Sequence, residues 1–443
     1  MNTPTEVPTP TEVPTPTEVP TPTEVPTPTE VPTPAVGSPD LADPRFWRLP
    51  APARAEAFAE LRRRPAPVYF GDRATGRGFH ALVRHADVVE ASRTPAVFRS
   101  GPGVTTPEPP RWVRLLFGDS MVNLDDPRHA QLRRIVSRAF TPRLLGRIEE
   151  DVRRIATALV DEVERDRPED FVGPVAAELP FQVICSMMGI PEESRRTILG
   201  LVNRTSAGTG VARTRRGRLR VPGRGLAALA RMQGIVAEIG RERRRRPAED
   251  LISALVTADV DGRRLTGREL GAFFSLLLVA GVETTRNALA HGLHLLTVHP
   301  EQRALLLADL DGRLDGAVDE IVRHATPIVQ FRRTVAVDHE LGGPGGPLLR
   351  AGEKVALYYG SANRDETVFP DPEAFDITRT PNPHLGYGGG GPHYCLGAHL
   401  ARQEMTVLFR ELFTRLPGAR SLGEPVLVPS SFDHRVRALR FTF

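Results

Sequence analysis

The sequence of 443 residues predicts a mainly α-helical fold with small β-sheets. Apolar residues recur at helical spacing over most of the chain, and the strand-like runs are short and few. Hydrophobic residues make up 40 %, which is enough to bury a large core. The longest apolar candidate, residues 273–282, is shorter than a membrane-spanning helix and is interrupted by Ser275. We therefore expect no membrane contact.

Helices and strands are predicted in chain order from these patterns. A turn signal between residues 67–70 and 78–83 favours a β-hairpin. Helical periodicity predicts helices over residues 128–140, 144–163, 180–188, 226–245, 250–258, 270–296 and 398–416. Short apolar runs at residues 335–341 and 354–359 predict strands.

A six-residue repeat opens the chain. Thr-Pro-Thr-Glu-Val-Pro occurs five times over residues 3–32. Proline lacks an amide donor and forces the residue before it into an extended conformation, so neither a helix nor a central strand can form there. We predict a disordered tail over residues 1–37 and one globular domain over residues 38–443. A proline-motif ligand, a spacer or a tether for an interaction protein is the functional alternative for the tail.

The cysteines, the N-terminus and the basic runs each exclude a class of protein. Cys185 and Cys395 cannot build a disulfide framework or a Cys-rich zinc site, and Cys185 lies in an apolar stretch typical of core packing. The N-terminus lacks the basic start and apolar stretch of a secretory signal, so we expect a cytoplasmic protein. Two basic runs, residues 213–224 and 241–246, lack interleaved aromatics, so we expect no nucleic-acid partner.

The most informative segment runs over residues 384–397, directly before the last predicted helix. Four consecutive glycines, residues 388–391, can adopt positive φ and let the chain approach a flat ligand closely. We expect the following helix to lower the pKa of Cys395 and favour its thiolate, which is a metal ligand. Because no second Cys or His cluster completes a zinc shell, a thiolate-bound haem fits better. The alternative is a glycine-rich turn with an incidental buried cysteine.

This segment resembles the signature of the cytochrome P450 family, in which an aromatic residue and glycines precede His-x-Cys-x-Gly. Tyr387, His393, Cys395 and Gly397 carry the resemblance. The spacing, with one glycine more than in most bacterial members, is similar to that of actinobacterial members that oxidise steroids, branched lipids and terpenes. The resemblance implies the cytochrome P450 fold over residues 38–443, with haem between a distal helix and the cysteine loop, and Cys395 as the iron ligand.

A second motif, Ala-Gly-Val-Glu-Thr-Thr, occupies residues 280–285 of a predicted apolar helix. An acid and hydroxyls are costly there, so something must compensate, and Ala280 and Thr284 share one helix face. The resemblance implies that Thr284 and Glu283 are the catalytic residues that handle protons, and that Ala280 and Gly281 leave room beside the haem. An exposed polar helix turn is the alternative.

The resemblance also implies contacts that hold the haem and the loop. It assigns four residues to the haem propionates and one glycine to the cofactor-binding loop: His129, Arg133, Arg333, His393 and Gly389. Glu320 and Arg323, with Arg379 as third partner, are expected to form an ion network that braces the cysteine loop. Such a pair means little alone, because the same spacing recurs on ordinary helix surfaces.

The implied function is a monooxygenase that inserts one atom of dioxygen into a hydrophobic terpenoid, steroid or polyketide-like substrate. The implied cofactor is haem b, and the implied electron donors are a separate ferredoxin and ferredoxin reductase. We expect a monomer whose basic surface, including Arg134 and Arg138, steers the acidic partner. The basic segment 205–225 leaves an acidic or carrier-bound substrate open. A peroxygenase and a non-catalytic haem-binding sensor or carrier are the alternatives.

Overall fold

The computed structural model describes residues 40–72, 77–105, 120–206, 223–258 and 264–443. The expected tail over residues 1–37 lies outside these ranges, as does most of the basic run 213–224. Within the described ranges, no helix has the length and apolar character needed to cross a membrane. Helices predominate and the sheets are small, which confirms the predicted fold class.

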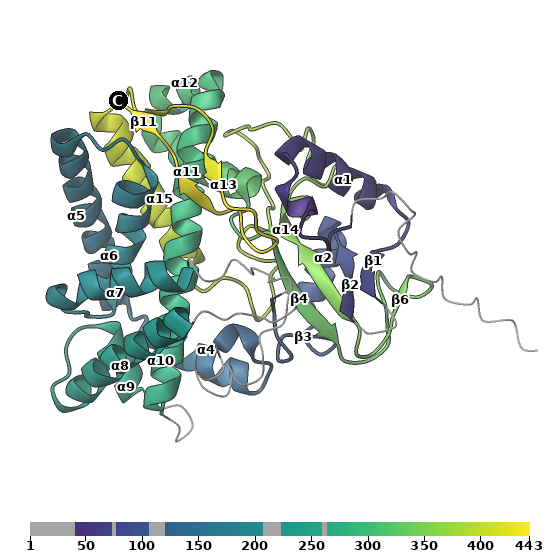
Figure 1. The fold of residues 1–443 in the computed structure, drawn as a ribbon, viewed down its shortest axis with the longest axis horizontal. Coiled ribbons are helices and arrows are strands. Elements are labelled where there is room, and N and C mark those ends of the chain that lie inside the picture. Colours follow the sequence, from purple (N-terminus) through teal and green to yellow (C-terminus); the bar gives the residue numbers. More distant parts are fainter. Residues whose placement is uncertain (1–39, 73–76, 106–119, 207–222, 259–263) are drawn as a thin grey trace, which may run out of the picture.

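One side of the molecule, at the right of Figure 1, is built on a five-stranded sheet. Its strands are β1 (Val68–Asp72), β2 (Arg77–Leu82), β3 (Phe98–Arg99), β4 (Gln330–Val335) and β7 (Lys354–Tyr358). The order is β1-β2-β7-β4-β3, and the predicted hairpin is its outer edge, where Val68 pairs with Ala81. β7 runs parallel to β2 and antiparallel to β4. The predicted strand at residues 354–359 is therefore confirmed.

Two-stranded sheets account for the other strands in the described ranges. They are β5 (His339–Glu340) with β6 (Leu348–Leu349), β8 (Arg420–Ser421) with β11 (Phe441–Thr442), and β9 (Val426–Leu427) with β10 (Val436–Ala438). The single strand predicted over residues 335–341 is wrong. Val335 ends β4, and a bend at the exposed Val337 separates it from His339, which pairs with Leu349 in a different sheet.

Helices fill the other side of the molecule, at the left of Figure 1, and every helix predicted above is present. They are α4 (Arg128–Ala139), α5 (Pro142–Asp166), α6 (Glu178–Met187), α7 (Glu192–Ser206), α8 (Gly223–Arg245), α9 (Leu251–Thr257), α10 (Gly267–Leu277), α11 (Glu283–Val298), α12 (Pro300–Ala308), α13 (Leu310–Ala325) and α15 (Ala398–Arg415). Three further helices accompany the sheet: α1 (Ala51–Arg63), α2 (His85–Arg93) and α14 (Tyr359–Ala362).

The longest helical column runs through the middle of the molecule and joins α10 to α11 (Figure 1). Thr266 and Glu269 begin it with a capping box, because each side chain accepts a hydrogen bond from the other residue's backbone N–H. A π-helical turn, η4 (Leu278–Val282), lies between the two helices. The column corresponds to the helix predicted over residues 270–296, and the π-helical turn falls on the Ala-Gly-Val motif.

Candidate active site

The cysteine loop ends where α15 begins. The backbone N–H of Cys395 donates to the carbonyl of Tyr387 at 3.0 Å, which closes the loop over the glycines. Gly388, Gly390 and Gly391 have φ values of 103°, 85° and 73°, a region that side-chain-bearing residues rarely adopt. The predicted need for glycine in this loop is therefore confirmed.

The glycines bring the loop against α2. A Cβ atom on Gly389 would lie 2.6 Å from Oγ of Ser92, and one on Gly391 would lie 2.2 Å from the carbonyl oxygen of Ser92. Arg93 Nε donates to the carbonyl of Gly389 at 3.3 Å. The close approach that we expected toward a flat ligand is thus made, at these two positions, toward a helix. The assignment of Gly389 to cofactor binding stays a prediction.

The Cys395 thiol differs from the sequence-based expectation. Its pKa is raised, not lowered, because desolvation by the surrounding protein outweighs a hydrogen bond from the backbone of Gly397 and the charges of Arg133 and Arg402. The helix terminus is too weak to compensate for that desolvation. Cys395 is nonetheless solvent-accessible. The thiol is therefore flanked by protein and still accessible, as a cofactor ligand must be.

Two histidines meet beside this thiol. The rings of His129, on α4, and His393, on the cysteine loop, lie 4.2 Å apart between centroids. Burial is the main reason that the pKa of His393 falls to about 3, and nearby Arg333 adds to the effect. Burial also lowers the pKa of His129. Ser100 Oγ is 3.1 Å from Nε2 of His393 and fixes its ring. Both imidazoles are therefore neutral and can donate one N–H each.

Two arginines complete a positive cluster. Arg133, on α4, donates to the carbonyl of Tyr394 at 2.8 Å, and the buried Arg333, on β4, donates to the carbonyl of Arg332 at 2.8 Å. Among the residues that the structure describes, neither guanidinium forms an ion pair with a carboxylate. A buried cation without a counter-ion, such as Arg333, is costly, so the cluster fits a ligand that carries acidic groups. The acidic groups of haem are its propionates, so the four residues predicted to bind them fit haem.

The thiol does not belong to a protein-built metal cage. No three His, Cys, Asp or Glu side chains within the described ranges come together as a metal-binding set. The other cysteine, Cys185 on α6, is fully buried and burial raises its pKa to about 12, so it is an inert part of the core, as predicted.

The second motif lies at the junction of η4 and α11. Thr284 Oγ1 donates to the carbonyl of Ala280 at 2.5 Å, which confirms that the two residues share a face. Ala280 and Val279 are exposed in the middle of the column, between the buried Leu278 and Val282. A Cβ atom on Gly281 would lie 2.6 Å from Cδ1 of Ile184, so packing against α6 already explains this glycine. Its role beside a haem stays a prediction.

Glu283 points into an ion-pair network that the sequence did not reveal. Its Oε2 lies 2.6 Å from Nη2 of Arg286 and 3.9 Å from Nε of Arg435. Arg435 also bridges to Asp433 at 2.9 Å, and the three partners are nearly buried. Unpartnered polar atoms surround the network, namely Arg286 Nε, Asn287 Nδ2 and Asp433 Oδ1. Buried atoms of this kind are usually satisfied by ordered water.

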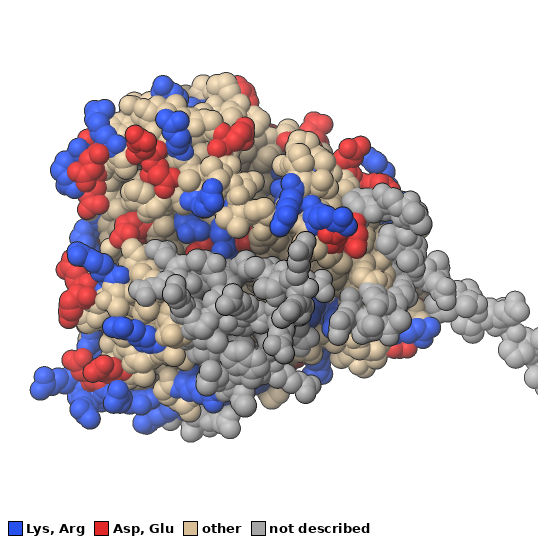
Figure 2. Space-filling model, in the orientation of Figure 1, with Lys and Arg blue, Asp and Glu red and all other residues tan. Residues whose placement is uncertain are grey.

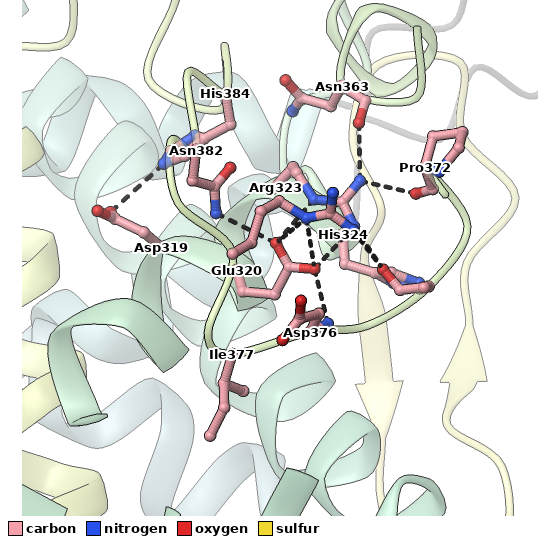
Figure 3. Close-up of polar contacts among 12 residues, drawn as sticks. Asp319, Glu320, Arg323, His324, Asn363, Pro372, Asp376, Ile377, Asn382 and His384 are labelled. Atoms are coloured by element: carbon pink, nitrogen blue, oxygen red, sulfur yellow. Dashed lines mark hydrogen bonds and ion pairs between the residues drawn. The ribbon is translucent and has the colours of Figure 1, made fainter. Parts of the chain in front are cut away.

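Glu320 and Arg323 form the scaffold predicted from the motif (Figure 3). The Arg323 guanidinium donates to Glu320 through Nε at 2.7 Å and Nη2 at 2.8 Å, and neither side chain is exposed. Arg379 lies 3.4 Å from Glu320, which confirms the third partner. Asn382 Nδ2 donates to Glu320 Oε2 at 3.1 Å, and Arg323 donates to the carbonyl of Pro372 at 2.7 Å. The network thus fastens the segment that leads into the cysteine loop.

A second brace joins α13 to α15 beneath the loop. Arg402 Nε donates to Asp319 Oδ1 at 2.7 Å, and the Arg402 guanidinium lies 4.3 Å from the ring centroid of Tyr387. His384 Nε2 lies 3.3 Å from the same carboxylate. The sequence reasoning missed Arg402. The sequence places Arg402 in the helix that follows the cysteine motif, but no local pattern identified Asp319 as its partner.

The surface carries separate basic areas. Figure 2 shows Lys and Arg gathered along the lower end of the molecule, where α8 and α9 lie, and residues Arg243, Arg244 and Arg245 end α8. On α4, Arg134 and Arg138 are exposed, as expected for a docking surface. Arg143 forms an ion pair with Glu249, so its charge is partly balanced.

Comparisons with known proteins point to one family. A family model described as Cytochrome P450 matches residues 229–416. The methyl-branched lipid omega-hydroxylase of Mycobacterium tuberculosis is 44 % identical over 418 residues, which cover 90 % of this chain and 93 % of the relative. The steroid C26-monooxygenase of Mycolicibacterium smegmatis is 36 % identical over 394 residues, which cover 86 % of this chain and 88 % of the relative.

A solved structure is similar over nearly the whole chain. A Mycobacterium marinum cytochrome P450 in complex with pseudoionone has a TM-score of 0.81 and 42 % identity, and the match covers 91 % of this chain and 98 % of that one. This chain therefore belongs to the cytochrome P450 family, and it is a monooxygenase of that family. The mycobacterial relatives confirm the predicted likeness to actinobacterial members, and membership implies haem as the cofactor.

Proposed function

We propose that this monooxygenase uses haem b to hydroxylate a hydrophobic substrate that has a methyl-branched hydrocarbon end. The observation that carries the proposal is the accessible Cys395 thiol near Arg133, together with Arg333 near His393. Neither cation has a carboxylate partner in the described ranges. Bound haem supplies the reductive activation of dioxygen, in which one oxygen atom enters the substrate and the other leaves as water.

The residues that would hold the haem come from three parts of the fold. Cys395 would supply the thiolate ligand. Four residues would bind the propionates: His129 and Arg133 of α4, Arg333 of β4 and His393 of the cysteine loop. Ala280 and Gly281 would border the distal face, and Gly389 would border the loop side. The exposure of Ala280 supports its place, whereas Gly281 and Gly389 rest on the family resemblance.

Thr284 and Glu283 would control protons at the distal face. The Thr284 hydroxyl donates its proton to the carbonyl of Ala280, so its lone pairs are free to accept a hydrogen bond from a proton-delivering group. Glu283, next in the chain, lies among buried polar atoms whose hydrogen bonds ordered water would complete. An acid between water and a threonine is suited to pass protons inward.

The substrate class follows from the names of the relatives. An omega-hydroxylase of methyl-branched lipids and a C26-monooxygenase of steroids both act near the end of an aliphatic chain, and the similar crystal structure holds pseudoionone. A branched aliphatic portion is common to a methyl-branched lipid, to the C26 end of a steroid and to pseudoionone, whereas the steroid ring system is not. We therefore favour a methyl-branched lipid, terpenoid or sterol side chain over a polyketide.

Electrons would come from a separate ferredoxin and its reductase. The exposed Arg134 and Arg138 on α4 support an acidic partner, because α4 also carries Arg133, whose guanidinium contacts the residue next to Cys395. The same helix would thus join the docking surface to the cofactor.

The test is reconstitution with a ferredoxin, its reductase and NADPH, using a terminally methyl-branched fatty acid and a sterol. We expect a spin-state shift on binding, a product hydroxylated at the branched end, and a Thr284→Ala variant that binds substrate equally but diverts electrons to peroxide. Thr297→Ala is the control, because Thr297 also back-bonds within α11, to Leu293 at 2.7 Å. Turnover with peroxide alone and no need for the reductase would indicate a peroxygenase. Binding without product would indicate a sensor or carrier.

A further inference from the structure

The N-terminal repeat is a feature of the sequence that the proposed function leaves without a role. Residues 3–32 contain five copies of Thr-Pro-Thr-Glu-Val-Pro, with five Glu and neither Lys nor Arg. The formal net charge of the whole chain is +4, so removing these five negative charges leaves +9 for the rest. The repeat is therefore an acidic segment attached to a basic domain.

The length of the repeat unit matches a polyproline II helix, the conformation that its proline content predicts. Such a helix has three residues per turn, so residues six apart lie on the same edge. The glutamates of the five units therefore share one edge with alternating threonines, and the valines share a second edge with alternating prolines. Successive glutamates are roughly 19 Å apart, because each residue adds about 3.1 Å. The repeat lies outside the described ranges, and its sequence predicts a binding surface that offers cations beside an apolar side chain.

The surface beside the cysteine loop offers this combination. On α4, Arg134 and Arg138 are exposed and four residues apart, so they lie on one face of the helix. Tyr394, the residue before Cys395, is 36 % exposed. Arg133 of the same helix donates to the carbonyl of Tyr394 at 2.8 Å, which holds this aromatic residue next to α4. Exposed aromatic side chains are the surfaces on which polyproline II segments dock.

The other basic area, at the end of α8, fits the repeat less well. Arg243 is engaged in an ion pair with Asp250 at 2.6 Å, and the exposed Glu249 adds negative charge just beyond the helix. Among the described residues of α8 and α9, no large apolar side chain is exposed. The end of α8 thus offers cations without an apolar contact for the Val and Pro edge.

The repeat is long enough to reach α4. The described chain starts at Asp40, and the carbonyl of Leu41 accepts a hydrogen bond from Nε1 of Trp47 at 3.1 Å, which fixes this end of the domain. Glu18, in the middle copy, can lie roughly 70 Å from Asp40 in a polyproline II chain. A domain of this size is only roughly 55 Å across. Attachment to the same chain keeps the repeat at a local concentration on the order of millimolar, so weak contacts suffice for binding.

We propose that the repeat docks on the α4 face of its own chain and so competes with the acidic ferredoxin. Its glutamates bind Arg134 and Arg138, and its Val and Pro edge packs on Tyr394. Docking itself requires no redox chemistry, whereas the competition rests on the proposed function. Exposed ion pairs are weak and are screened by salt, so the repeat binds reversibly. The contact therefore inhibits reduction at low salt, and salt relieves the inhibition.

The first test measures how close the repeat lies to the cofactor in the haem-loaded full chain. Thr17→Cys carries a fluorescent dye on the third edge of the predicted polyproline II helix, away from both proposed contacts. Cys185 is fully buried and Cys395 would hold the iron, so neither takes the dye. Haem quenches the fluorescence of a dye that is near it. We expect a short fluorescence lifetime at low salt that lengthens as salt screens the ion pairs.

Variants at the two basic areas locate the repeat. Arg134→Gln with Arg138→Gln should lose the quenching at low salt, whereas Arg245→Gln with Arg246→Gln, exposed arginines at the end of α8, should keep it. A lifetime that does not respond to salt, that is unchanged in the α4 variant, or that lengthens in the α8 variant overturns the proposal. A lifetime that depends on protein concentration shows that the repeat binds a second copy of the chain, and this also overturns it.

The apolar edge has its own test. Val13→Thr with Val19→Thr keeps the charge and the shape of the repeat but weakens packing on Tyr394, so the lifetime at low salt should lengthen. Thr11→Ser with Thr23→Ser changes the third edge and is the control, in which the lifetime should not change. Equal lifetimes in the two variants would remove Tyr394 from the docking surface.

The second test measures whether the docked repeat slows reduction. With all five repeat glutamates changed to Gln, the ferredoxin should reduce the protein roughly threefold faster at low salt, the scale of one or two exposed ion pairs. Because this change also makes the whole chain more positive, it is repeated in the Arg134→Gln, Arg138→Gln chain, where it should have no effect. Equal acceleration in both chains, or none in either, overturns the inhibition. A wild-type protein that makes no product contradicts the proposed function instead, while the lifetime result stands.

Discussion

Arg133 reaches from α4 to the carbonyl oxygen of Tyr394, 2.8 Å away, and so contacts the residue next to the cysteine that would bind iron. No carboxylate pairs with Arg133 within the described ranges. One side chain therefore links the predicted docking helix, the cysteine loop and the positive cluster of the candidate haem site.

Removing this arginine should weaken haem binding. Arg133→Met keeps the aliphatic stem but loses a charged hydrogen bond worth about 1.5–3 kcal/mol, which corresponds to roughly ten- to a hundredfold in affinity. The measurement is the rate of haem transfer to a haem-scavenging apoprotein. Arg138→Met, an exposed change on the same helix, is the control. Equal transfer rates for the two variants would contradict the role of the positive cluster.

The buried ion pair should dominate the stability of the cysteine loop. Arg323→Lys cannot form the two-pronged contact with Glu320, and breaking a buried pair costs about 3–5 kcal/mol. Urea unfolding of the haem-loaded protein measures this cost. Arg64→Lys is the matched control, because the pair of Arg64 with Glu60 is about half exposed and such pairs are worth about 0–1 kcal/mol. Similar losses in both variants would show that the network is no scaffold.

Alkaline pH should destabilise the protein through Glu404, a buried acid on α15. Because its pKa is about 8 when folded and ordinarily 4.5, the folded state binds more protons than the unfolded state between these values. The free energy of unfolding therefore falls as pH rises through this window, by roughly 5 kcal/mol at the limit. Glu404→Gln should remove this contribution, as urea titrations at pH 5, 7 and 9 would detect. A variant with the same slope as wild type contradicts the burial argument.

Charge on α4 should set the rate of reduction. Replacing Arg134 and Arg138 together by Gln should slow electron transfer from the ferredoxin at low salt and flatten its salt dependence, because long-range steering of an acidic partner is lost. Stopped-flow reduction measures both effects. Arg241→Gln, an exposed arginine of α8, is the control. Unchanged kinetics in the α4 variant would exclude docking there.

The sequence predicted the parts of the site that depend on local spacing. Thr284 and Ala280 share a face because they are four residues apart in a helix, and the glycines surround Cys395 because only they adopt the required φ. The missed contacts join distant segments. Glu283 meets Arg435 of the C-terminal segment, and Ser92 of α2 abuts the glycine loop, neither of which leaves a local pattern.

Electrostatics was the least predictable property. The expected lowering of the Cys395 pKa considered the helix terminus alone, whereas the fold adds desolvation from protein around the loop, which is larger. The raised pKa of Glu404 likewise comes from burial, and only the packing of α11 against α15 reveals that. The sequence identifies which side chains can ionise, but whether each one is charged depends on its surroundings in the folded protein.

The most direct test of the account is the absorption spectrum of the reduced, carbon monoxide-bound protein, wild type against Cys395→Ser. We expect wild type to show the red-shifted band of a thiolate-bound haem, and Cys395→Ser to lose that band. A wild-type protein that takes up no haem, or a Cys395→Ser variant that keeps the thiolate band, would contradict the assignment of Cys395 as the iron ligand.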